Sequence, residues 1–194
     1  MKRLAIAALA ALAVAAPVVT VTAWGNTGHR LIGVAAMRAL PDDLPGFLRT
    51  PDAVADVGEL AREPDRWKGA GQPHDRERDT AHFIDLDDQG RVYDQRGMSI
   101  DDLPRLKSEY DAALTKAGLD VDDAGYLPYA MIDGWQQLAR DFAYWRVLNA
   151  AEKRETDMER QAWYRADRIR REALILRDIG VMGHYVGVGS QPHH

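Results

Sequence analysis

The histidines are the residues of this chain whose positions suggest chemistry. Three of the six lie in the last stretch, GHYVGVGSQPHH, at His184, His193 and His194. His29 and His82 stand far upstream. The sequence has no cysteine, which excludes disulfides and a cysteine-based zinc finger. A metal would therefore be bound by imidazoles and carboxylates, which are ligands that zinc accepts. A single histidine is usually a satisfied core or surface residue, so only the joint arrangement indicates a site.

Other catalytic patterns are absent from the sequence. It contains no serine or cysteine nucleophile motif, no phosphate-binding glycine loop and no HExxH. The run from Asp85 to Gly90 superficially resembles a calcium loop, but Arg96 occupies the twelfth position, where a bidentate glutamate is needed. We therefore do not expect an EF-hand.

The first 23 residues have the features of a signal peptide. Two basic residues precede an apolar run over 4–19, and small residues follow it. The run is shorter than the ~20 residues of a membrane span and contains Pro17, so an uncleaved anchor is the weaker alternative. We expect a secreted or periplasmic protein without stable membrane insertion. Cleavage after Ala23 would leave Trp24 with a free α-amino group.

The remaining segment, residues 24–194, is long enough for one domain with a hydrophobic core and too short for two. Without the leader's Lys2 and Arg3, 23 basic residues face 30 acidic ones, a formal charge of −7. No overall basic field therefore recruits nucleic acid. Binding of a polyanion would have to be local, for instance through bound cations. We expect a monomer.

Apolar residues recur at helical spacing from Trp24 onward and predict an all-α fold, a single-domain multi-helix bundle. The expected helices span about 26–40, 51–62, 103–117, 127–151 and 155–179. Residues 63–93 break the pattern into a loop rich in glycine, proline and charge, within which 82–86 is a candidate extended run. We expect this loop to carry function, because long irregular connections in compact domains usually do.

Side-chain patterns refine three of these helices. Ser99 with Asp102 forms a capping box ahead of the third helix, which Gly118 ends. The fourth helix carries Trp135, Phe142 and Trp145, which we interpret as core aromatics. The last helix has an apolar side that consists of Ala162, Ala166, Ile169, Ala173 and Leu176. Its dense charged face is interpreted as solvated.

Three motifs together resemble the secreted trinuclear zinc phosphodiesterases. They are WGNTGH from Trp24 to His29, AHFID from Ala81 to Asp85, and HYVG-x-x-SQP-x-H from His184 to His194. This superfamily includes the fungal single-strand-specific nucleases P-one and S-one and the bacterial zinc phospholipases C. Each motif alone is weak, but the three occur in the right order and span most of the mature chain. The resemblance implies an all-α bundle of that type and a zinc cofactor.

The resemblance also implies a ligand set for the first zinc ion. Trp24 would bind it through its terminal amine and carbonyl oxygen, and His29 would join it. An α-amino group has a pKa of about 8, so binding at neutral pH must displace its proton. An uncleaved leader would leave an amide that cannot do this. His194 matches a ligand of the third zinc ion.

For the second zinc ion, the resemblance implies His82 and His184 as ligands, together with an upstream aspartate. Asp65 in the run PDRWK is the nearest fit, and Asp56 is the runner-up. Asp65 and His184 would serve catalysis through this site, where zinc lowers the pKa of a bound water toward about 7 and holds the phosphate.

The sequence has features of two substrate classes, nucleic acids and phospholipids. Phe83 and Asp85 match positions that, in the nuclease branch, stack on a base and hydrogen-bond its edge. The following LDDQGRVY is closer to the phospholipase branch. The resemblance therefore implies hydrolysis of phosphodiesters in single-stranded nucleic acid, with phospholipid headgroup esters as the alternative.

Two departures from the family pattern favour a third interpretation. Val188 stands four residues after His184, where the family's HxxGD has an aspartate that bridges two zinc ions. The family's closing H-x-x-x-D pair has no counterpart before His194, although His193 is a weak substitute for one ligand. We therefore expect a domain that is incomplete at its C-terminus and holds fewer than three zinc ions, and a zinc-binding protein without turnover remains an alternative.

Overall fold

The computed structural model describes residues 25–190, and this part of the chain is all-α, as predicted. Its helices are α2 (Asn26–Arg38), α3 (Pro51–Leu60), α4 (Glu63–Arg66), α5 (His74–Asp79), α6 (Lys107–Ala117), α7 (Val121–Ala124), α8 (Leu127–Arg154) and α9 (Met158–Gly189). Three 3-10 turns accompany them, η1 (Gly46–Arg49), η2 (Thr80–His82) and η3 (Ile100–Asp102). The predictions for the signal peptide, Trp24, His193 and His194 lie outside the described residues.

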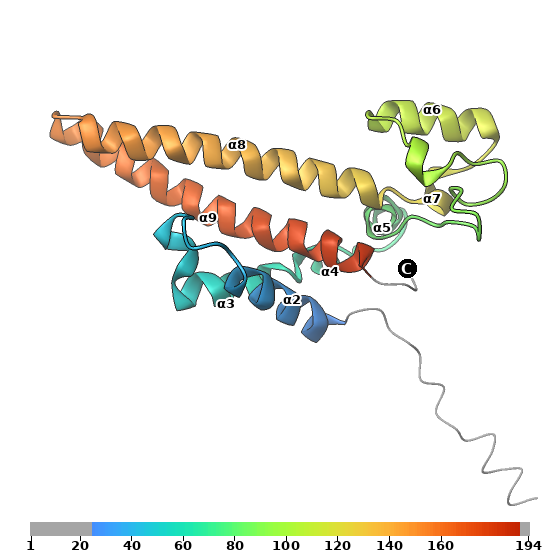
Figure 1. Ribbon diagram of the computed structural model, residues 1–194, viewed down its shortest axis with the longest axis horizontal. Coiled ribbons are helices and arrows are strands. Elements are labelled where there is room, and N and C mark those ends of the chain that lie inside the picture. Colours follow the sequence, from blue (N-terminus) through green and yellow to red (C-terminus); the bar gives the residue numbers. More distant parts are fainter. Residues whose placement is uncertain (1–24, 191–194) are drawn as a thin grey trace, which may run out of the picture.

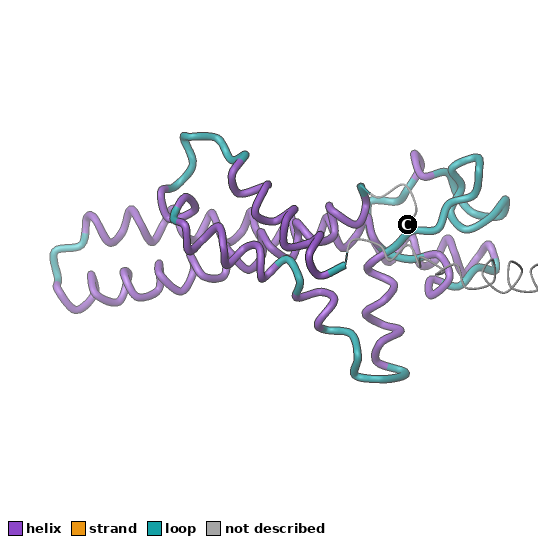
Figure 2. Tube along the Cα trace, turned by 90° about the horizontal axis from the view of Figure 1, so that it is seen from below, coloured by secondary structure: helices purple, strands orange, loops and turns teal. Residues whose placement is uncertain are grey.

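The long helices α8 and α9 form an antiparallel hairpin that is the spine of the molecule (Figure 1). Helices α2 and α3 pack against each other and along the C-terminal half of α9, whereas α6 and α7 lie near the start of α8. The far tip of the hairpin projects beyond the other helices in both views (Figures 1 and 2). The end of α9 is therefore the part of the spine to which the short helices gather.

Helix capping and the burial of apolar side chains explain the core between α2, α3 and α9. The Thr50 side chain caps α3 by accepting a hydrogen bond from the Ala53 amide, 3.1 Å away, and Pro51 occupies the first helical position. The fully buried Val57 and Ile175 meet across α3 and α9 within one apolar cluster. Helices α2, α3 and α8 begin and end within about three residues of their predicted limits.

The prediction of a continuous loop over 63–93 is wrong in its first part. Helices α4 and α5 and the turn η2 lie within it. Pro64 starts α4, because a proline is tolerated in the first helical turn. The run after His82 is extended only as isolated bridges, Ile84 with Gly125 and Leu86 with Val92.

The predicted start of the third helix is also wrong. The Ser99 hydroxyl accepts a hydrogen bond from the Asp101 amide and caps only the short turn η3. Leu103 then takes extended backbone angles, φ −57° and ψ 131°, because the following Pro104 disfavours helical conformation at the residue before it. Helix α6 therefore begins only at Lys107 and ends as predicted at Gly118, which has a positive φ.

Helix α9 continues about ten residues past its predicted end near 179. The glycines in this extension allow close packing. A β-carbon at Gly180 would lie 2.8 Å from the carbonyl carbon of Leu60, and one at Gly187 would lie 3.2 Å from the Ile32 side chain. The glycines therefore bring α9 close to both α3 and α2.

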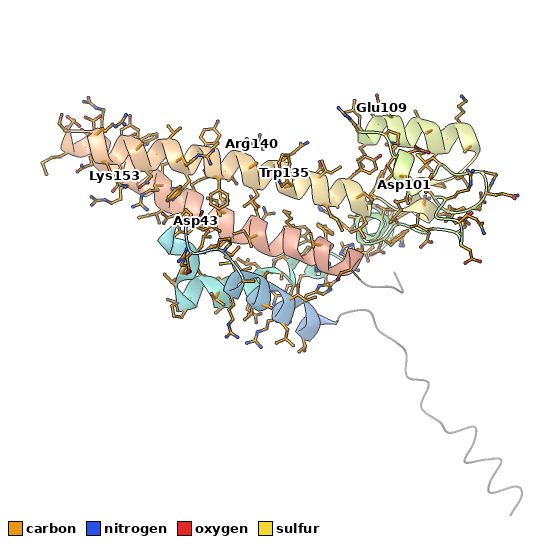
Figure 3. All side chains as sticks on the ribbon, in the orientation of Figure 1. Asp43, Asp101, Glu109, Trp135, Arg140 and Lys153 are labelled. Carbon is orange, nitrogen blue, oxygen red and sulfur yellow. The ribbon has the colours of Figure 1, made fainter. Side chains whose placement is uncertain are left out.

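Two expectations for the hairpin are corrected. Trp135 (labelled in Figure 3) is 60% exposed and Ile169 is 53% exposed, so neither belongs to the core. Conversely, part of the charged face of α9 is turned toward α8. Arg168 pairs with Glu152 at 2.7 Å, and Asp141 and Asp178 are buried. Phe142 and Trp145 do pack against the apolar cluster.

Within residues 25–190, no helix is long and apolar enough to cross a membrane.

Candidate metal centre

Three histidines surround one aspartate where four elements meet. His29 comes from α2, Asp65 from α4, His82 from η2 and His184 from α9. The distances from the imidazole Nε2 atoms to the nearest Asp65 carboxylate oxygen are 3.7 Å for His29, 3.8 Å for His82 and 4.0 Å for His184. All three histidines are at most 8% exposed. Residues far apart in the sequence thus form one buried cluster.

The close approach of α9 to α3 positions His184. Gly180 leaves no side chain between these helices, so the next turn of α9 lies against the end of α3. There the Nδ1 of His184 donates a hydrogen bond to the Ala61 carbonyl oxygen, 2.9 Å away. The proton on Nδ1 leaves the Nε2 lone pair directed toward Asp65.

A similar hydrogen bond orients His82. Its Nδ1 donates to the Arg78 carbonyl oxygen at 3.0 Å, one turn earlier in the chain. The backbone then becomes extended at Phe83, and the Phe83 carbonyl oxygen accepts a hydrogen bond from the Leu127 amide at 3.0 Å. Gly125 permits this contact, since a β-carbon there would collide with the Phe83 carbonyl. The unprotonated Nε2 of His82 therefore also directs its lone pair toward the aspartate.

His29 is held against His184 by ring stacking. The two ring centroids are 3.9 Å apart with an interplanar angle of 26°. Small residues make this possible, because Gly58 lets α2 approach α3 and Gly187 lets it approach α9. The two oxygens of Asp65 thus face different histidines, Oδ2 toward His29 and Oδ1 toward the other two.

The electrostatics of the cluster favour a bound cation. The Nε2 atoms of His82 and His184 are buried and make no hydrogen bond within the described part of the chain. Burial, with the positive charge of Lys68, lowers the pKa of His82. Burial and the neighbouring His29 lower the pKa of His184 to about 3, so this imidazole is neutral at pH 7. Buried lone pairs that face a carboxylate repel it unless a positive ion lies between them.

The donor set and its dimensions fit a transition metal. One ligand atom from each of His29, Asp65 and His184 lies within 4.8 Å of the other two. Tetrahedral zinc with bonds of about 2.1 Å needs ligand atoms about 3.4 Å apart. The Nε2-to-carboxylate distances of 3.7, 3.8 and 4.0 Å are longer than this by a few tenths of an ångström, and His82 lies outside the group of three that meets the 4.8 Å limit. The hydrogen bonds to backbone carbonyls are the kind that orient metal-binding histidines.

Lys68 is a charged neighbour of the cluster that sequence analysis missed. Its Nζ lies 3.4 Å from Asp65 Oδ1 and 3.7 Å from an Asp79 oxygen. The spacing of three residues from Asp65 was the available indication, since such residues share a helix face. Lys68 partly balances the charge of Asp65 from the outer side.

The other predicted site residues lie elsewhere or outside the described chain. The runner-up ligand Asp56 is exposed on α3 and is not in the cluster. Phe83 is partly buried and Asp85 is exposed on the segment that follows His82. Partial desolvation and the nearby Asp123 raise the pKa of Asp85. Val188 is buried against Leu127.

Comparison with known proteins gives no independent assignment. A scan against family models and searches of curated proteins and of solved structures found no match for this chain. The cluster and the three motifs are therefore the features of this chain that bear on its function.

Proposed function

We propose that this chain is a zinc-dependent phosphodiester hydrolase of the single-strand nuclease type. The observation that carries the proposal is the cluster of His29, Asp65, His82 and His184, in which at least two neutral imidazoles direct lone pairs at one carboxylate. Nitrogen and oxygen donors without cysteine suit zinc. The three motifs that resemble the zinc phosphodiesterases support the choice of reaction.

The residues of the cluster would divide the work between binding and orientation. His82, His184 and Asp65 Oδ1 would hold one ion, and Asp65 Oδ2 with His29 would contribute to a second. We propose that Trp24 and His194 complete the sites. Zinc held by these residues would lower the pKa of a coordinated water toward about 7 and would so supply a nucleophile at neutral pH. The carbonyls of Ala61 and Arg78 keep the imidazoles in the required tautomer.

Zinc content and activity test this proposal together. We expect purified chain, processed after Ala23, to bind zinc and to release nucleotides from heat-denatured DNA. His82→Ala and His184→Ala should each lower the zinc content measured by elemental analysis and abolish the release. Retained leader should weaken zinc binding, because Trp24 would then have an amide in place of its amine. Unchanged zinc stoichiometry in both histidine variants would overturn the proposed site.

A second candidate function is zinc binding without catalysis. The burial of Val188 favours it, because an apolar side chain occupies the position at which the resembled family bridges two ions. A chain that binds zinc and leaves denatured DNA and phosphatidylcholine intact would establish this function. Release of phosphocholine alone would instead indicate a phospholipase C.

A further inference from the structure

A hollow lies beside the metal cluster on the surface of α4 and α5. Its lining residues are Trp67, Ala70, His74 and Arg78, and its volume is about 410 Å³. Trp67 is two residues from Asp65, and Arg78 is four residues before His82, whose Nδ1 bonds the Arg78 carbonyl. The hollow is therefore joined to the cluster by two short segments of chain.

His74, Arg78 and His82 lie in order along the chain from the hollow to the cluster. His74 and Arg78 are four residues apart on α5 and share a side of that helix, and His82 follows in the 3-10 turn η2. His82 faces Asp65 in the cluster, while Arg78 and His74 line the hollow. A ligand that extends from the cluster along this side would meet Arg78 first and then His74.

Arg78 is available to an anion. It forms no ion pair with the described carboxylates, although Asp75 and Asp79 are near it in the sequence. Asp75 instead accepts hydrogen bonds from the amides of Gly69 and Ala70, both at 2.9 Å, and Asp79 pairs with Lys68. Asp75 and Asp79 are thus already engaged.

Trp67 holds the arginine side chains in place. The guanidinium carbon of Arg78 lies 5.9 Å from the centroid of the Trp67 ring, and that of Arg177, from α9, lies 5.7 Å from it. Such a contact restrains the Arg78 side chain while its N–H groups stay free to donate, whereas Arg177 already donates to Asp178 at 3.0 Å. A guanidinium binds phosphate through two parallel hydrogen bonds, which makes phosphate the anion that this arrangement suits best.

We infer that Arg78, Trp67 and His74 form a second phosphate subsite, which takes a neighbouring phosphate of a nucleic acid strand whose scissile phosphate lies at the metal cluster. This inference rests on the proposed function and specifies its substrate. A phospholipid headgroup ester has no repeating backbone of phosphates, whereas a strand presents one at each nucleotide. The subsite therefore favours an oligonucleotide over a phospholipid.

Binding without hydrolysis tests the subsite. The probe is fluorescein-labelled oligothymidylate of eight nucleotides, and anisotropy is measured at low salt with EDTA so that no cleavage occurs. We expect Arg78→Ala to raise the Kd about tenfold, the loss of one charge-assisted contact. The slope of log K against log salt should fall by about 0.7, the value for one phosphate of a single strand. Arg78→Lys should recover part of the affinity, because it keeps the charge but not the paired hydrogen bonds.

The matched control is Arg146→Ala, which removes the same charge from an exposed position on α8. We expect it to bind like the unmodified chain. Equal affinities of the Arg78→Ala and Arg146→Ala variants would overturn the inference, and so would an effect of Arg78→Ala confined to anionic phosphatidylglycerol vesicles.

A comparison of two substrates separates this inference from the proposed function. For the zinc-loaded chain, Arg78→Ala should raise the KM for the oligonucleotide and leave that for bis(p-nitrophenyl) phosphate, which has one phosphate, unchanged. Hydrolysis of both substrates with no effect of Arg78→Ala would defeat the subsite alone. If the zinc-loaded chain hydrolyses neither substrate, the proposed function is wrong. If Arg78→Ala nevertheless weakens oligonucleotide binding, the phosphate subsite is still supported.

Discussion

His184 on α9 donates a hydrogen bond from Nδ1 to the carbonyl oxygen of Ala61, which lies 2.9 Å away at the end of α3. This contact joins residues 123 positions apart and fixes which imidazole nitrogen faces Asp65. A side-chain position is thus controlled by how closely two helices pack. The glycines of α9 therefore help to shape the candidate metal centre, although they have no side chain that could bind an ion.

Gly180→Ala should separate α9 from α3. The added β-carbon would lie 2.8 Å from the Leu60 carbonyl carbon and 2.9 Å from the Ala61 nitrogen, both backbone atoms. We expect a loss of about 1–3 kcal/mol in the free energy of unfolding, which is the usual cost of overpacking. Zinc affinity in a chelator competition should fall about tenfold or more, because the hydrogen bond that orients His184 is displaced.

Gly183→Ala is the matched control for this prediction. It lies in the same helix, and a β-carbon there would meet no atom within 4 Å. The alanine should stabilise the helix by up to about 1 kcal/mol and leave zinc affinity unchanged. Equal zinc affinities in the two variants would show that the spacing of α3 and α9 does not control His184.

Asp65→Asn should lower zinc affinity and not the stability of the zinc-free protein. An amide is a poor zinc ligand, so affinity should fall about 100-fold in a chelator competition. Without zinc, the amide relieves the repulsion between the carboxylate and the facing lone pairs, and its N–H₂ can donate to them. The zinc-free variant should therefore melt no lower than the unmodified chain, despite losing the contact with Lys68.

Asp56→Asn removes a charge from an exposed position on α3 and serves as the control for Asp65→Asn. We expect no change in its zinc affinity. Reduced affinity in Asp56→Asn, with full affinity in Asp65→Asn, would restore the runner-up as the ligand.

The raised pKa of the buried Asp178 should make stability fall as the pH rises, whereas the pKa of its partner Asp141 is lowered and acts only at more acidic pH. Burial and the hydrogen bond with Asp141 raise the pKa of Asp178 to about 6, against about 3.9 in the unfolded chain. The folded protein therefore binds a proton between about pH 4 and 6 that the unfolded protein does not. The resulting stabilisation is complete below pH 4 and is lost as the pH rises through 6.

Asp178→Asn should remove this dependence, because an amide donates to Asp141 at every pH. Denaturant unfolding should find the variant about 2 kcal/mol more stable than the unmodified chain at pH 7.5 and about equal at pH 4. Asp167→Asn, which removes an acid on α9 that pairs with Arg170, should show no such divergence. A variant that is less stable at pH 7.5 would mean that the Asp178 carboxylate contributes as an ion, through Arg177.

Much of the fold was predictable because local rules determined it. The apolar periodicity places α2, α3 and α8 within a few residues. Helix α9 runs past its predicted end, and the glycines of this extension pack closely against α3 and α2, which depends on the neighbouring helices. The pairing of Glu152 with Arg168 likewise depends on the neighbouring helix and has no signature within either one.

The candidate site was likewise predictable only in part. His29, Asp65, His82 and His184 have no common local spacing, and only the resemblance to a family placed them in one site. Their hydrogen bonds end on backbone carbonyls, which leave no trace in the sequence. The hollow beside them was missed because residues 63–80 were expected to be an irregular loop. Only the helix α5 brings His74 and Arg78 to one side of the chain, and this helix was not predicted.

Val188→Asp tests how far the resemblance extends. Val188 is 3% exposed and packs in an apolar cluster with Leu127 and Tyr185. A carboxylate there should lower the unfolding free energy of the zinc-free protein by about 3 kcal/mol, because a buried charge without a partner is costly. If position 188 lies close enough to bound zinc, as the family's HxxGD implies, the ion should restore much of that loss. Zinc should then raise the melting temperature of Val188→Asp more than that of Val188→Asn, which has the same shape without the charge. An equal rise in both would mean that position 188 belongs to the core alone, and that zinc binding here needs only the ligands already facing Asp65.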